Sequence, residues 1–271
     1  MLLPMRIEFS KMQGFGNDFF VFDAPVAAKA HLDSEKLRAL ADRHTGVGFD
    51  QALMLEAPRD PGTRAFYRIF NADGSEVEQC GNGARCIAAL LYTRAPELGR
   101  ELTMGSPGGT VRARVGDDGL VSVDMGVPSF DESPSYTLKI NGSDFEIGAV
   151  CIGNPHAVLR VADVDTAPVD VLGPKIEHHP RFPKRVNAGF MQIVDRGQIR
   201  LRVFERGVGE TLACGTGAGG AVAVGRRQGL LDSQVRVQMR GGTALVAWPG
   251  TGEHLWLTGP AITVFTGSID I

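Results

Sequence analysis

The chain has 271 residues, a formal net charge of −3 at pH 7 and a hydrophobic content of 43%. This length suits two domains of ordinary size. The weakly acidic balance offers no basic surface to a polyanion, which argues against a nucleic acid partner. No apolar run approaches the ~20 residues needed to cross a bilayer, so we expect no membrane association and a cytoplasmic protein.

Hydrophobic periodicity predicts a chain rich in strands and poor in helices. In chain order, the pattern predicts a helix over 34–43, a helix over 84–94, strands over 111–115, 121–125, 136–140 and 199–204, a helix over 218–228, and strands over 235–239 and 244–248. This mixture indicates the α/β class in the broad, mixed α+β sense. Two of the three predicted helices begin shortly after a cysteine, Cys80 or Cys214.

The sequence contains an internal repeat. Residues 68–84 align without a gap on residues 202–218, with seven of seventeen positions identical at an offset of 134 residues. The identical positions include an Arg-x-Phe, a Glu and the motif Cys-Gly-x-Gly-Ala. Two weaker matches occur in the same order: Gly-Asn at 16–17 with 153–154, and Gly-Phe-x-Gln at 48–51 with 189–192. Together they predict a duplicated domain.

The domain boundary is predicted within residues 124–134, where glycine, proline and serine cluster. We expect an N-terminal domain over 1–123, completed by 265–271, and a C-terminal domain over 124–264. Each half then carries one Cys-Gly-x-Gly-Ala turn. In a pseudo-symmetric pair of domains, the two turns are expected to face each other across the crevice where ligand sites concentrate.

A cysteine at a helix start has the chemistry of an acid/base group. The partial positive charge of the helix N-terminus lowers a thiol pKa, and the glycines leave backbone N–H groups open to an anion such as a carboxylate. Two such groups on opposite faces of a carbon can remove one proton and deliver another, which inverts the stereocentre. Donors aimed at the carboxylate would stabilise the charge that develops. The pair Cys80 and Cys214 therefore predicts an amino-acid epimerase.

Cysteines and glycines of this kind also have other uses in proteins. A single Cys before glycines is more often a small buried side chain, but the repeat favours function here. Cys86 and Cys151 are expected in the core. The chain lacks a Cys-x-x-Cys motif, and its lysines have no phosphate-cradling context, so we expect neither a metal nor pyridoxal phosphate. The helix-start glycines would also suit a free phosphate.

Motifs throughout the chain resemble those of the diaminopimelate epimerase family. They are Lys-Met-Gln-Gly-Phe-Gly-Asn-Asp-Phe at 11–19, Gly-Val-Gly-Phe-Asp-Gln at 46–51, Asn-Ala-Asp-Gly-Ser-Glu at 71–76, Gln-Cys-Gly-Asn-Gly-Ala-Arg-Cys at 79–86, Gly-Asn-Pro-His at 153–156, Arg-Val-Asn-Ala-Gly-Phe at 185–190 and Glu-Arg-Gly-x-Gly-Glu-Thr at 205–211. The resemblance implies two similar domains, each with β-sheets wrapped around a central helix. It also implies cofactor-independent interconversion of LL- and meso-diaminopimelate, in lysine and peptidoglycan precursor biosynthesis.

The resemblance also implies roles for individual residues. Cys80 and Cys214 would be the catalytic pair, and His156 and Glu205 would tune their thiols. The substrate-binding set would be Asn17, Gln51, Asn71, Gly81, Asn82, Asn154, Asn187, Glu205, Arg206, Gly215 and Thr216. Of these, Gly81, Asn82, Gly215 and Thr216 would hold the reacting carboxylate through backbone amides, and Arg206 and Glu205 suit the carboxylate and ammonium of a distal zwitterion.

Three positions depart from the family pattern: Gln13, Ile152 and Phe265 stand where His, Met and Tyr are common. Phe265 lies in a region that the family links to dimerisation, so the resemblance implies a homodimer, with the Phe265 contact lacking a hydroxyl. The alternatives to diaminopimelate epimerisation are a proline or hydroxyproline racemase that uses the same cysteine pair, a phenazine-biosynthesis-like isomerase, and a binding module with a Cys80/Cys214 redox switch.

Overall fold

The computed structural model describes residues 6–25, 32–130, 133 and 135–271. The chain divides into two compact units, Met1–Val123 with Gly259–Ile271, and Asp124–Thr258. The expected boundary assigned 259–264 to the C-terminal domain, and the structure corrects this. Strand β18 (Ile262–Asp270) pairs with β1 (Arg6–Gly14) from residue 262 onward, so its whole length belongs to the first unit.

The described part of the first unit is a mixed sheet with helices. Its remaining elements are β2 (Asn17–Asp23), α2 (Ser34–Ala41), β3 (Gln51–Glu56), β4 (Phe66–Asn71), β5 (Glu76–Val77), α3 (Gly81–Arg94), the 3₁₀ turn η1 (Pro96–Leu98), β6 (Glu101–Ser106), β7 (Gly109–Val115) and β8 (Val121–Asp124). Strands β18, β1 and β2 run antiparallel, β2 is parallel to β3, and β3 is antiparallel to β4. Strand β4 then pairs with β5 and, in parallel, with β6, which leads to β7 and β8.

The second unit repeats this pairing pattern. Its elements are β9 (Tyr136–Ile140), β10 (Ser143–Cys151), β11 (Pro155–Arg160), α4 (Val169–Glu177), β12 (Asn187–Asp195), β13 (Gln198–Glu205), β14 (Gly209–Thr211), α5 (Gly215–Arg227), β15 (Gln234–Met239), β16 (Gly242–Ala247) and β17 (Trp256–Gly259). Strands β9, β10 and β11 are antiparallel, β11 is parallel to β12, and β13 joins β14 and, in parallel, β15. The duplication predicted from the sequence is present in the topology.

The register corrects one part of the predicted repeat. Ala52 pairs with Phe70 in the first unit, and Ala188 pairs with Phe204 in the second. Gln51 is therefore equivalent to Asn187, and the match of Gly-Phe-x-Gln at 48–51 with 189–192 is wrong by five residues. The identical residues of these two segments are a chance match in a glycine-rich chain and are not structurally equivalent.

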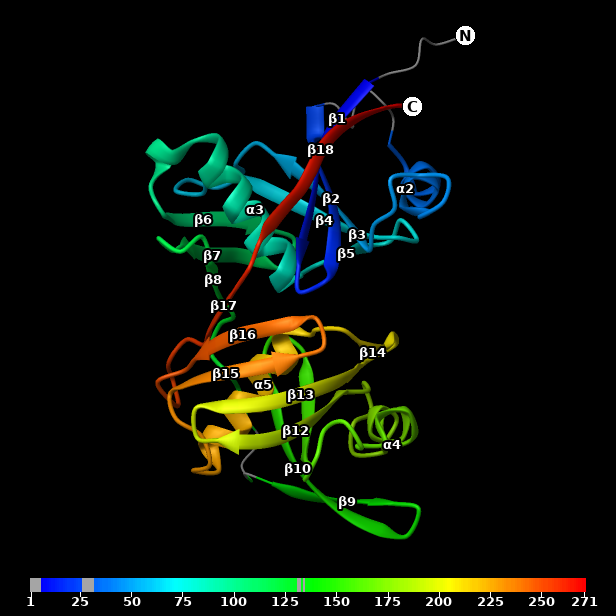
Figure 1. Cartoon of the computed structure of the whole chain (residues 1–271), viewed down its shortest axis with the longest axis vertical. Coiled ribbons are helices and arrows are strands. Elements are labelled where there is room, and N and C mark those ends of the chain that lie inside the picture. The colour runs from blue at the N-terminus through cyan, green and yellow to red at the C-terminus, as the bar shows by residue number, and fades with distance from the viewer. Residues whose placement is uncertain (1–5, 26–31, 131–132, 134) are drawn as a thin grey trace. The chain divides into compact units, whose positions relative to one another are not determined.

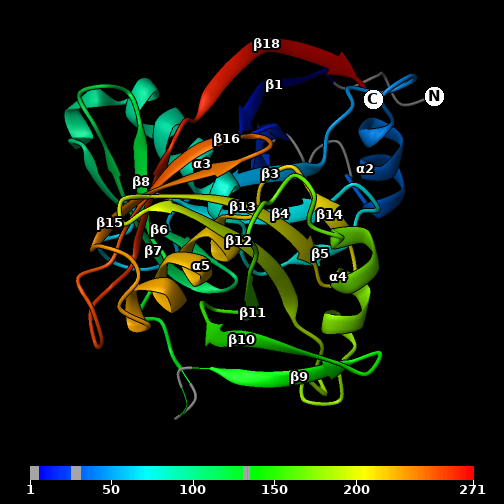
Figure 2. The ribbon, with the colours of Figure 1, turned by 60° about the horizontal axis from the view of Figure 1, so that its bottom comes forward.

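Helices α3 and α5 are enclosed by the strands of their units. A surface helix buries one stripe, whereas a helix that is apolar on all sides must be surrounded. In α5, nine consecutive residues from Gly217 to Gly225 are buried, and α3 is buried continuously from Asn82 to Ala88. Figure 2 shows α5 against the strands of its unit. This is the predicted arrangement of sheets around a central helix, which is confirmed.

The last strand of each repeat pairs with the first strand of the other repeat. Strand β9, the last of the first repeat, pairs with β10, and β18, the last of the second repeat, pairs with β1. Figure 1 shows the consequence: blue β1 and red β18, the two ends of the described chain, lie side by side. Each unit therefore contains chain from both repeats.

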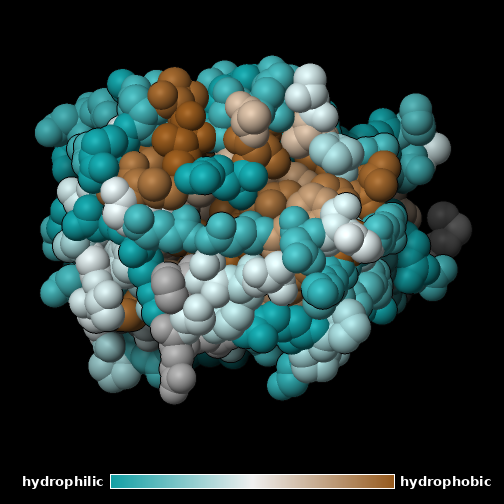
Figure 3. Space-filling view, turned by 90° about the horizontal axis from the view of Figure 1, so that it is seen from below, coloured by the Kyte–Doolittle hydropathy of each residue, from teal (hydrophilic) through white to brown (hydrophobic). Residues whose placement is uncertain are grey.

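The predicted helices and strands all occur, with ends shifted by a few residues. The pattern does not predict α4, which contains Pro174, or several strands buried on both faces, such as β2. On the face drawn in Figure 3, apolar side chains gather in the upper half of the view and polar side chains cover most of the lower half. Exposed apolar residues of the second unit include Val171, Val194 and Val208. No helix among the described residues is long and apolar enough to cross a membrane.

Candidate active site

Cys80 and Cys214 occupy the N-cap positions of α3 and α5. Each sulfur accepts a hydrogen bond at 3.4 Å from the backbone N–H three residues ahead, on Gly83 or Gly217. A thiol thus takes the place of the hydroxyl or carboxylate that usually caps a helix. The other N–H groups of the first turn remain available to an anion.

The glycines at these turns allow close packing against a neighbouring strand. A Cβ added to Gly83 would lie 3.1 Å from Leu53 Cδ2, and one added to Gly217 would lie 2.9 Å from Val203 Cγ2. Both distances are too short for a side chain to fit without movement. A side chain at the second glycine of either Cys-Gly-x-Gly motif would displace its neighbour, so these glycines allow each helix start to lie close against the strand.

The Arg and Glu of the repeat form an ion pair, here called the bracket, that links two strands in each unit. Arg68 Nε donates to Glu76 Oε1 at 2.6 Å, and Arg202 Nε donates to Glu210 Oε1 at 2.6 Å. A second guanidinium nitrogen completes each bidentate pair. Each bracket ties the long strand to the short strand that leads to the cysteine.

In the first unit, the structure brings Cys80 together with two predicted substrate-binding residues. The Cys80 thiol donates to Asn17 Oδ1 at 3.7 Å, and Asn82 Nδ2 donates to the same oxygen at 3.3 Å. Gln51 and Asn71, paired across β3 and β4, form a separate contact in which Gln51 Nε2 donates to Asn71 Oδ1 at 3.0 Å. Gln51 Oε1 is buried and has no hydrogen-bond partner among the described residues, which is uncommon for a buried polar atom.

In the second unit, Cys214 faces a carboxylate. Its thiol donates to Glu205 Oε2 at 3.2 Å and lies 3.5 Å from Thr216 Oγ1. Thr211 Oγ1 donates to the other Glu205 oxygen at 2.5 Å. Cys214 is 5% exposed. A buried thiol next to an anion holds its proton strongly.

The pKa of Cys214 corrects the expectation drawn from the helix start. Burial raises the pKa of Cys214 well above its ordinary value, and the negative charge of Glu205 raises it further. The Thr216 hydroxyl and the Gly217 N–H act in the opposite direction but are outweighed. In the unliganded protein Cys214 is therefore a protonated thiol, and Glu205 favours that form.

The predicted distal residues are linked by the backbone. Asn187 Oδ1 accepts from the Arg206 N–H, and Asn187 Nδ2 donates to the Pro155 carbonyl, both at 2.9 Å. The Arg206 guanidinium donates to the Lys184 carbonyl at 3.2 Å. Asn187 thus positions the main chain that carries Glu205 and Arg206.

His156 bonds to Asn154 rather than to a cysteine among the described contacts. Its Nε2 lies 2.8 Å from Asn154 Oδ1. Burial, assisted by the positive charge of Arg206, lowers the pKa of His156 to about 3. His156 is therefore a neutral imidazole at physiological pH, with a part in orienting Asn154.

This pKa gives a testable pH dependence. Because the folded-state pKa of His156 lies below its ordinary 6.5, the stability it contributes is complete above pH 6.5 and is lost as the pH falls toward 3. We expect the free energy of unfolding to fall by about 1.4 kcal/mol per pH unit in this window from His156 alone. Chemical denaturation of wild type and His156→Gln between pH 6.5 and 4.5 measures the difference in slope. Parallel slopes would contradict the assignment.

Sequence reasoning missed several residues that hold this site. Asp50 and Arg85 lie at the two ends of the contacts around Asn17 and Asn82. Thr211 holds Glu205, and buried Glu177 accepts the N–H of Gly207, directly after Arg206. Asp50 and Arg85 stand inside the quoted motifs, but a sequence pattern does not say which atoms meet.

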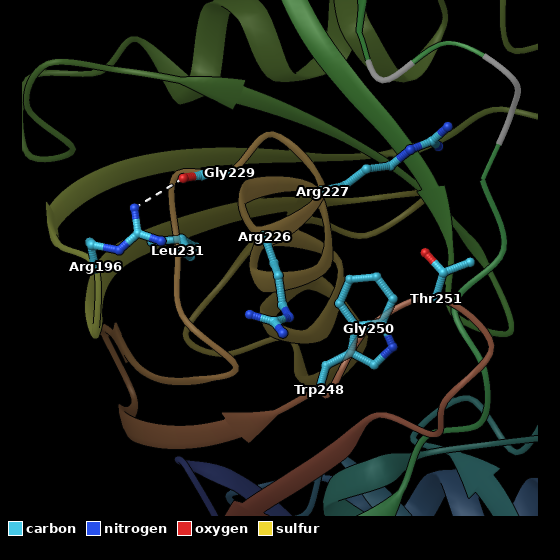
Figure 4. A pocket seen from close by; sticks show the side chains of 8 residues that line it. All are labelled: Arg196, Arg226, Arg227, Gly229, Leu231, Trp248, Gly250 and Thr251. Atoms are coloured by element: carbon cyan, nitrogen blue, oxygen red, sulfur yellow. Dashed lines mark hydrogen bonds between the residues drawn. The ribbon is translucent and has the colours of Figure 1, made fainter.

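A hollow of about 330 Å³ in the second unit lies away from these residues. It is lined by Arg196, Arg226, Arg227, Gly229, Leu231, Trp248, Gly250 and Thr251 (Figure 4). Its arginines have structural partners: Arg196 bonds to Asp232 and Gly229, and Arg226 to the Pro249 carbonyl. Arg226 and Arg227 end α5, where cations stabilise the helix dipole. None of the predicted site residues lines this hollow.

Comparison with solved structures shows the fold. A hydroxyproline epimerase from Agrobacterium vitis, solved with bound trans-4-hydroxy-L-proline, matches with a TM-score of 0.71 at 15% identity, over 98% of this chain and 93% of that one. A phenazine biosynthesis protein of the PhzF family from Bacillus anthracis matches with a TM-score of 0.71 at 18% identity, over 98% and 99%. At these identities the likeness concerns architecture alone.

Comparison of sequences is more specific. The family model for diaminopimelate epimerase matches residues 9–130 and 148–264. The diaminopimelate epimerase of Thioalkalivibrio sulfidiphilus is 54% identical, over 98% of this chain and 100% of the relative. That of Nitrosomonas europaea is 52% identical over the same shares. With a matching family model and relatives at this identity over nearly its whole length, the chain belongs to the diaminopimelate epimerase family.

Proposed function

We propose that this protein interconverts LL- and meso-diaminopimelate without a cofactor, as an isomerase of lysine and peptidoglycan precursor biosynthesis. The observation that carries the proposal is the pair of N-cap cysteines, Cys80 and Cys214, at equivalent positions of a duplicated unit in a member of this family. Each sulfur stands beside backbone N–H groups that suit a carboxylate.

The proposed reaction moves one proton off and another onto the same carbon. One cysteine, as thiolate, takes the Cα proton, and the electron pair left on Cα is delocalised into the carboxylate. The amides of Gly81, Asn82, Gly215 and Thr216 stabilise this charge. The other cysteine, as thiol, then delivers its proton to the opposite face of Cα. Atoms and charge balance, since one thiol is formed as the other is consumed.

The environment of Cys214 suggests how substrate binding prepares the thiol. Glu205 holds the Cys214 pKa high while its charge is uncompensated. A substrate ammonium paired with Glu205 would neutralise that charge and so make the Cys214 thiolate easier to form. Arg206 is proposed to bind the distal carboxylate, with Asn17, Gln51, Asn71, Asn154 and Asn187 completing the zwitterion site. Such a set does not suit proline, which has a single amine and carboxylate and therefore no distal ammonium and carboxylate for these residues to bind.

The direct test is an epimerase assay. Purified, fully reduced protein mixed with LL-diaminopimelate, with no added cofactor, should produce the meso form until the two interconvert at equilibrium. Proline and trans-4-hydroxyproline, assayed in parallel, should not racemise. Absence of conversion with diaminopimelate would refute the proposal, and turnover of the proline substrates alone would favour the racemase alternative. Activity under full reduction also separates the enzyme from a disulfide-switch module.

We also propose that the protein acts as a homodimer in the cytoplasm, where its four free thiols are maintained. Along its length β18 pairs with β1, and it exposes Ile262, Val264 and Phe265 by 48%, 55% and 49%. The Phe265 ring packs edge-on against Phe9 at 6.0 Å between centroids, which fixes its position. A row of half-exposed apolar side chains on a sheet edge suits a second copy of the same surface.

Replacement of Phe265 by Asp should weaken this dimer. A charge at the centre of an apolar interface carries a desolvation cost of several kcal/mol, so the dissociation constant should rise by at least about 30-fold. Sedimentation over a concentration series measures it. Val194→Asp, at an equally exposed valine of the second unit, is the matched control. A Phe265→Asp protein as dimeric as the control would place the interface elsewhere.

A further inference from the structure

Four polar side chains of the first unit form a continuous hydrogen-bonded chain past Cys80, here called the amide relay. Arg85 Nη2 donates to Asn82 Oδ1 at 2.6 Å, Asn82 Nδ2 donates to Asn17 Oδ1 at 3.3 Å, and Asn17 Nδ2 donates to Asp50 Oδ2 at 3.1 Å. The Cys80 thiol donates to the central oxygen, Asn17 Oδ1, at 3.7 Å. No described role in binding or catalysis accounts for the two ends.

The ends of the relay fix the direction of every bond in it. A guanidinium has only donors and a carboxylate only acceptors, whereas an Asn amide can turn either way. Arg85 therefore requires the Asn82 oxygen, which leaves the Asn82 NH₂ for Asn17. Asp50 requires the Asn17 NH₂, which leaves the Asn17 oxygen for Asn82 and Cys80. With these ends, Cys80 must face a carbonyl oxygen and not an NH₂ group.

Both ends are themselves held. Arg85 is fully buried, and its other nitrogens donate to the carbonyls of Gly81 and Pro260, each at 3.4 Å. The second oxygen of Asp50 accepts from Arg43 at 2.8 Å, and Oδ2 also accepts the Asp18 N–H at 3.1 Å. Asp50 thus meets donors at both oxygens. Burial of the Arg85 charge has a cost in folding free energy, as its lowered pKa of about 10 indicates.

The second unit has no such relay among its described residues. At the repeat offset of 134 residues, Asn82 corresponds to Thr216 and Arg85 to Gly219. There Cys214 faces the Glu205 carboxylate directly. A duplicated scaffold has therefore kept its cysteines and their caps while giving each sulfur a different partner, a neutral amide oxygen or an anion.

We propose that Asp50 and Arg85 are positioning residues that hold the Asn17 oxygen against Cys80 and so keep Cys80 a hydrogen-bond donor in the unliganded protein. The inference rests on the proposed catalytic role of Cys80, but the contact itself is tested by thiol chemistry rather than by turnover. Described groups of the first unit that interact electrostatically with Cys80 include Arg85, Tyr67 and Cys86. They are the same in all proteins compared below.

Asp50→Asn is the informative change. Donors face both Asp50 oxygens, Arg43 at one and Asn17 with the Asp18 N–H at the other, whereas an amide can accept at only one end. The bond that fixes the Asn17 oxygen against Cys80 is therefore weakened. A less firmly held acceptor and loss of the Asp50 charge both favour the Cys80 thiolate. We expect iodoacetamide to alkylate Cys80 about three- to tenfold faster at pH 7, with the midpoint of its pH profile shifted downward. Asp50→Glu, which keeps an acceptor, should resemble wild type.

The reduced, unliganded full chain is alkylated at a series of pH values around neutrality, and each cysteine is quantified by peptide mass spectrometry. Cys214 in the other unit is the internal reference, and buried Cys86 reports unfolding. A faster reaction confined to Cys80 in Asp50→Asn supports the proposal. A Cys80 profile that superimposes on wild type overturns it, and so does a rise at all three cysteines, which would make Asp50 a residue of fold stability.

Neutron diffraction on the wild type gives an independent reading. The deuterons of Asn17 should point to Asp50, and the Cys80 deuteron should point to Asn17 Oδ1. The reverse orientation of the Asn17 amide would overturn the proposal without any variant. Neither result bears on whether the wild type epimerises diaminopimelate, which the assay above decides separately.

Discussion

Replacement of either Cys80 or Cys214 by alanine should abolish epimerisation, because each direction of the reaction needs one sulfur as base and the other as acid. General acid–base groups contribute about 10²–10⁴-fold each, so kcat should fall by at least about a thousandfold in either variant. Serine should not rescue activity, since a hydroxyl has far too high a pKa to form the base. Coupled detection of meso-diaminopimelate measures the loss.

Cys86→Ala is the matched control for this prediction. Cys86 lies in the helix that Cys80 caps, is fully buried, and burial raises the pKa of its thiol to about 12. It should stay inert, and its variant should keep activity near that of the parent. An alanine variant at Cys80 or Cys214 that epimerises at close to the parent rate would refute the paired mechanism.

Deuterium labelling tests the same pair without mutation. In heavy water, the thiol that delivers the proton has already exchanged with solvent, so early product should carry deuterium at the inverted carbon. Unreacted substrate should remain largely undeuterated, because the proton removed stays on the first sulfur. A single base would return part of the original proton to the product. Mass spectrometry of both epimers at low conversion separates the two cases.

Replacement of Arg206 by alanine should reduce kcat/KM by about 2–5 kcal/mol of transition-state stabilisation, or roughly 30- to several-thousandfold. The reason is an unpaired carboxylate left at the distal end of a partly desolvated substrate. Loss of the Arg206 charge should also ease protonation of His156, whose pKa it helps to lower. Steady-state kinetics with LL-diaminopimelate measures the effect.

Arg196→Ala, at an exposed arginine paired with Asp232, controls for loss of a surface charge and should leave kcat/KM unchanged. Arg206→Lys should recover part of the activity, since it restores charge without the bidentate geometry. If Arg206→Ala were folded and within a factor of about two of wild type, the distal assignment would be wrong.

Much of the fold could be predicted because the sequence contains an internal repeat. The repeat around Cys80 and Cys214 identifies both central helices and the strands before them, and the Arg68–Glu76 and Arg202–Glu210 brackets explain why those letters match. Strands with one exposed face, such as β15, alternate in burial and are predictable. Strand β2, with four consecutive buried residues, gives no alternation and is not.

The chemistry of the site was less predictable than its residues. Position at a helix start predicted a lowered thiol pKa, but for Cys214 burial and Glu205 decide the direction, and neither is visible in one sequence. The partner of His156 was likewise unpredictable, because it depends on the bond to Asn154. Asp50 and Arg85 stand within the family motifs, but a sequence does not show that they act on Cys80. They do so because the fold brings the start of β2, the residue before β3 and the first turns of α3 into contact.

The pairing of β1 with β18 has a consequence for how the protein is made. Strand β1, with buried Ile7 and Phe9, is translated well before its sheet partner β18, which follows every strand of the second unit in the chain. The first unit therefore stays open along one edge until β18 has been translated. A nascent chain, or one cut short by a premature stop codon just before β18, should expose this edge to chaperones and proteases. Quality control of the first unit thus depends on whether β18 was translated.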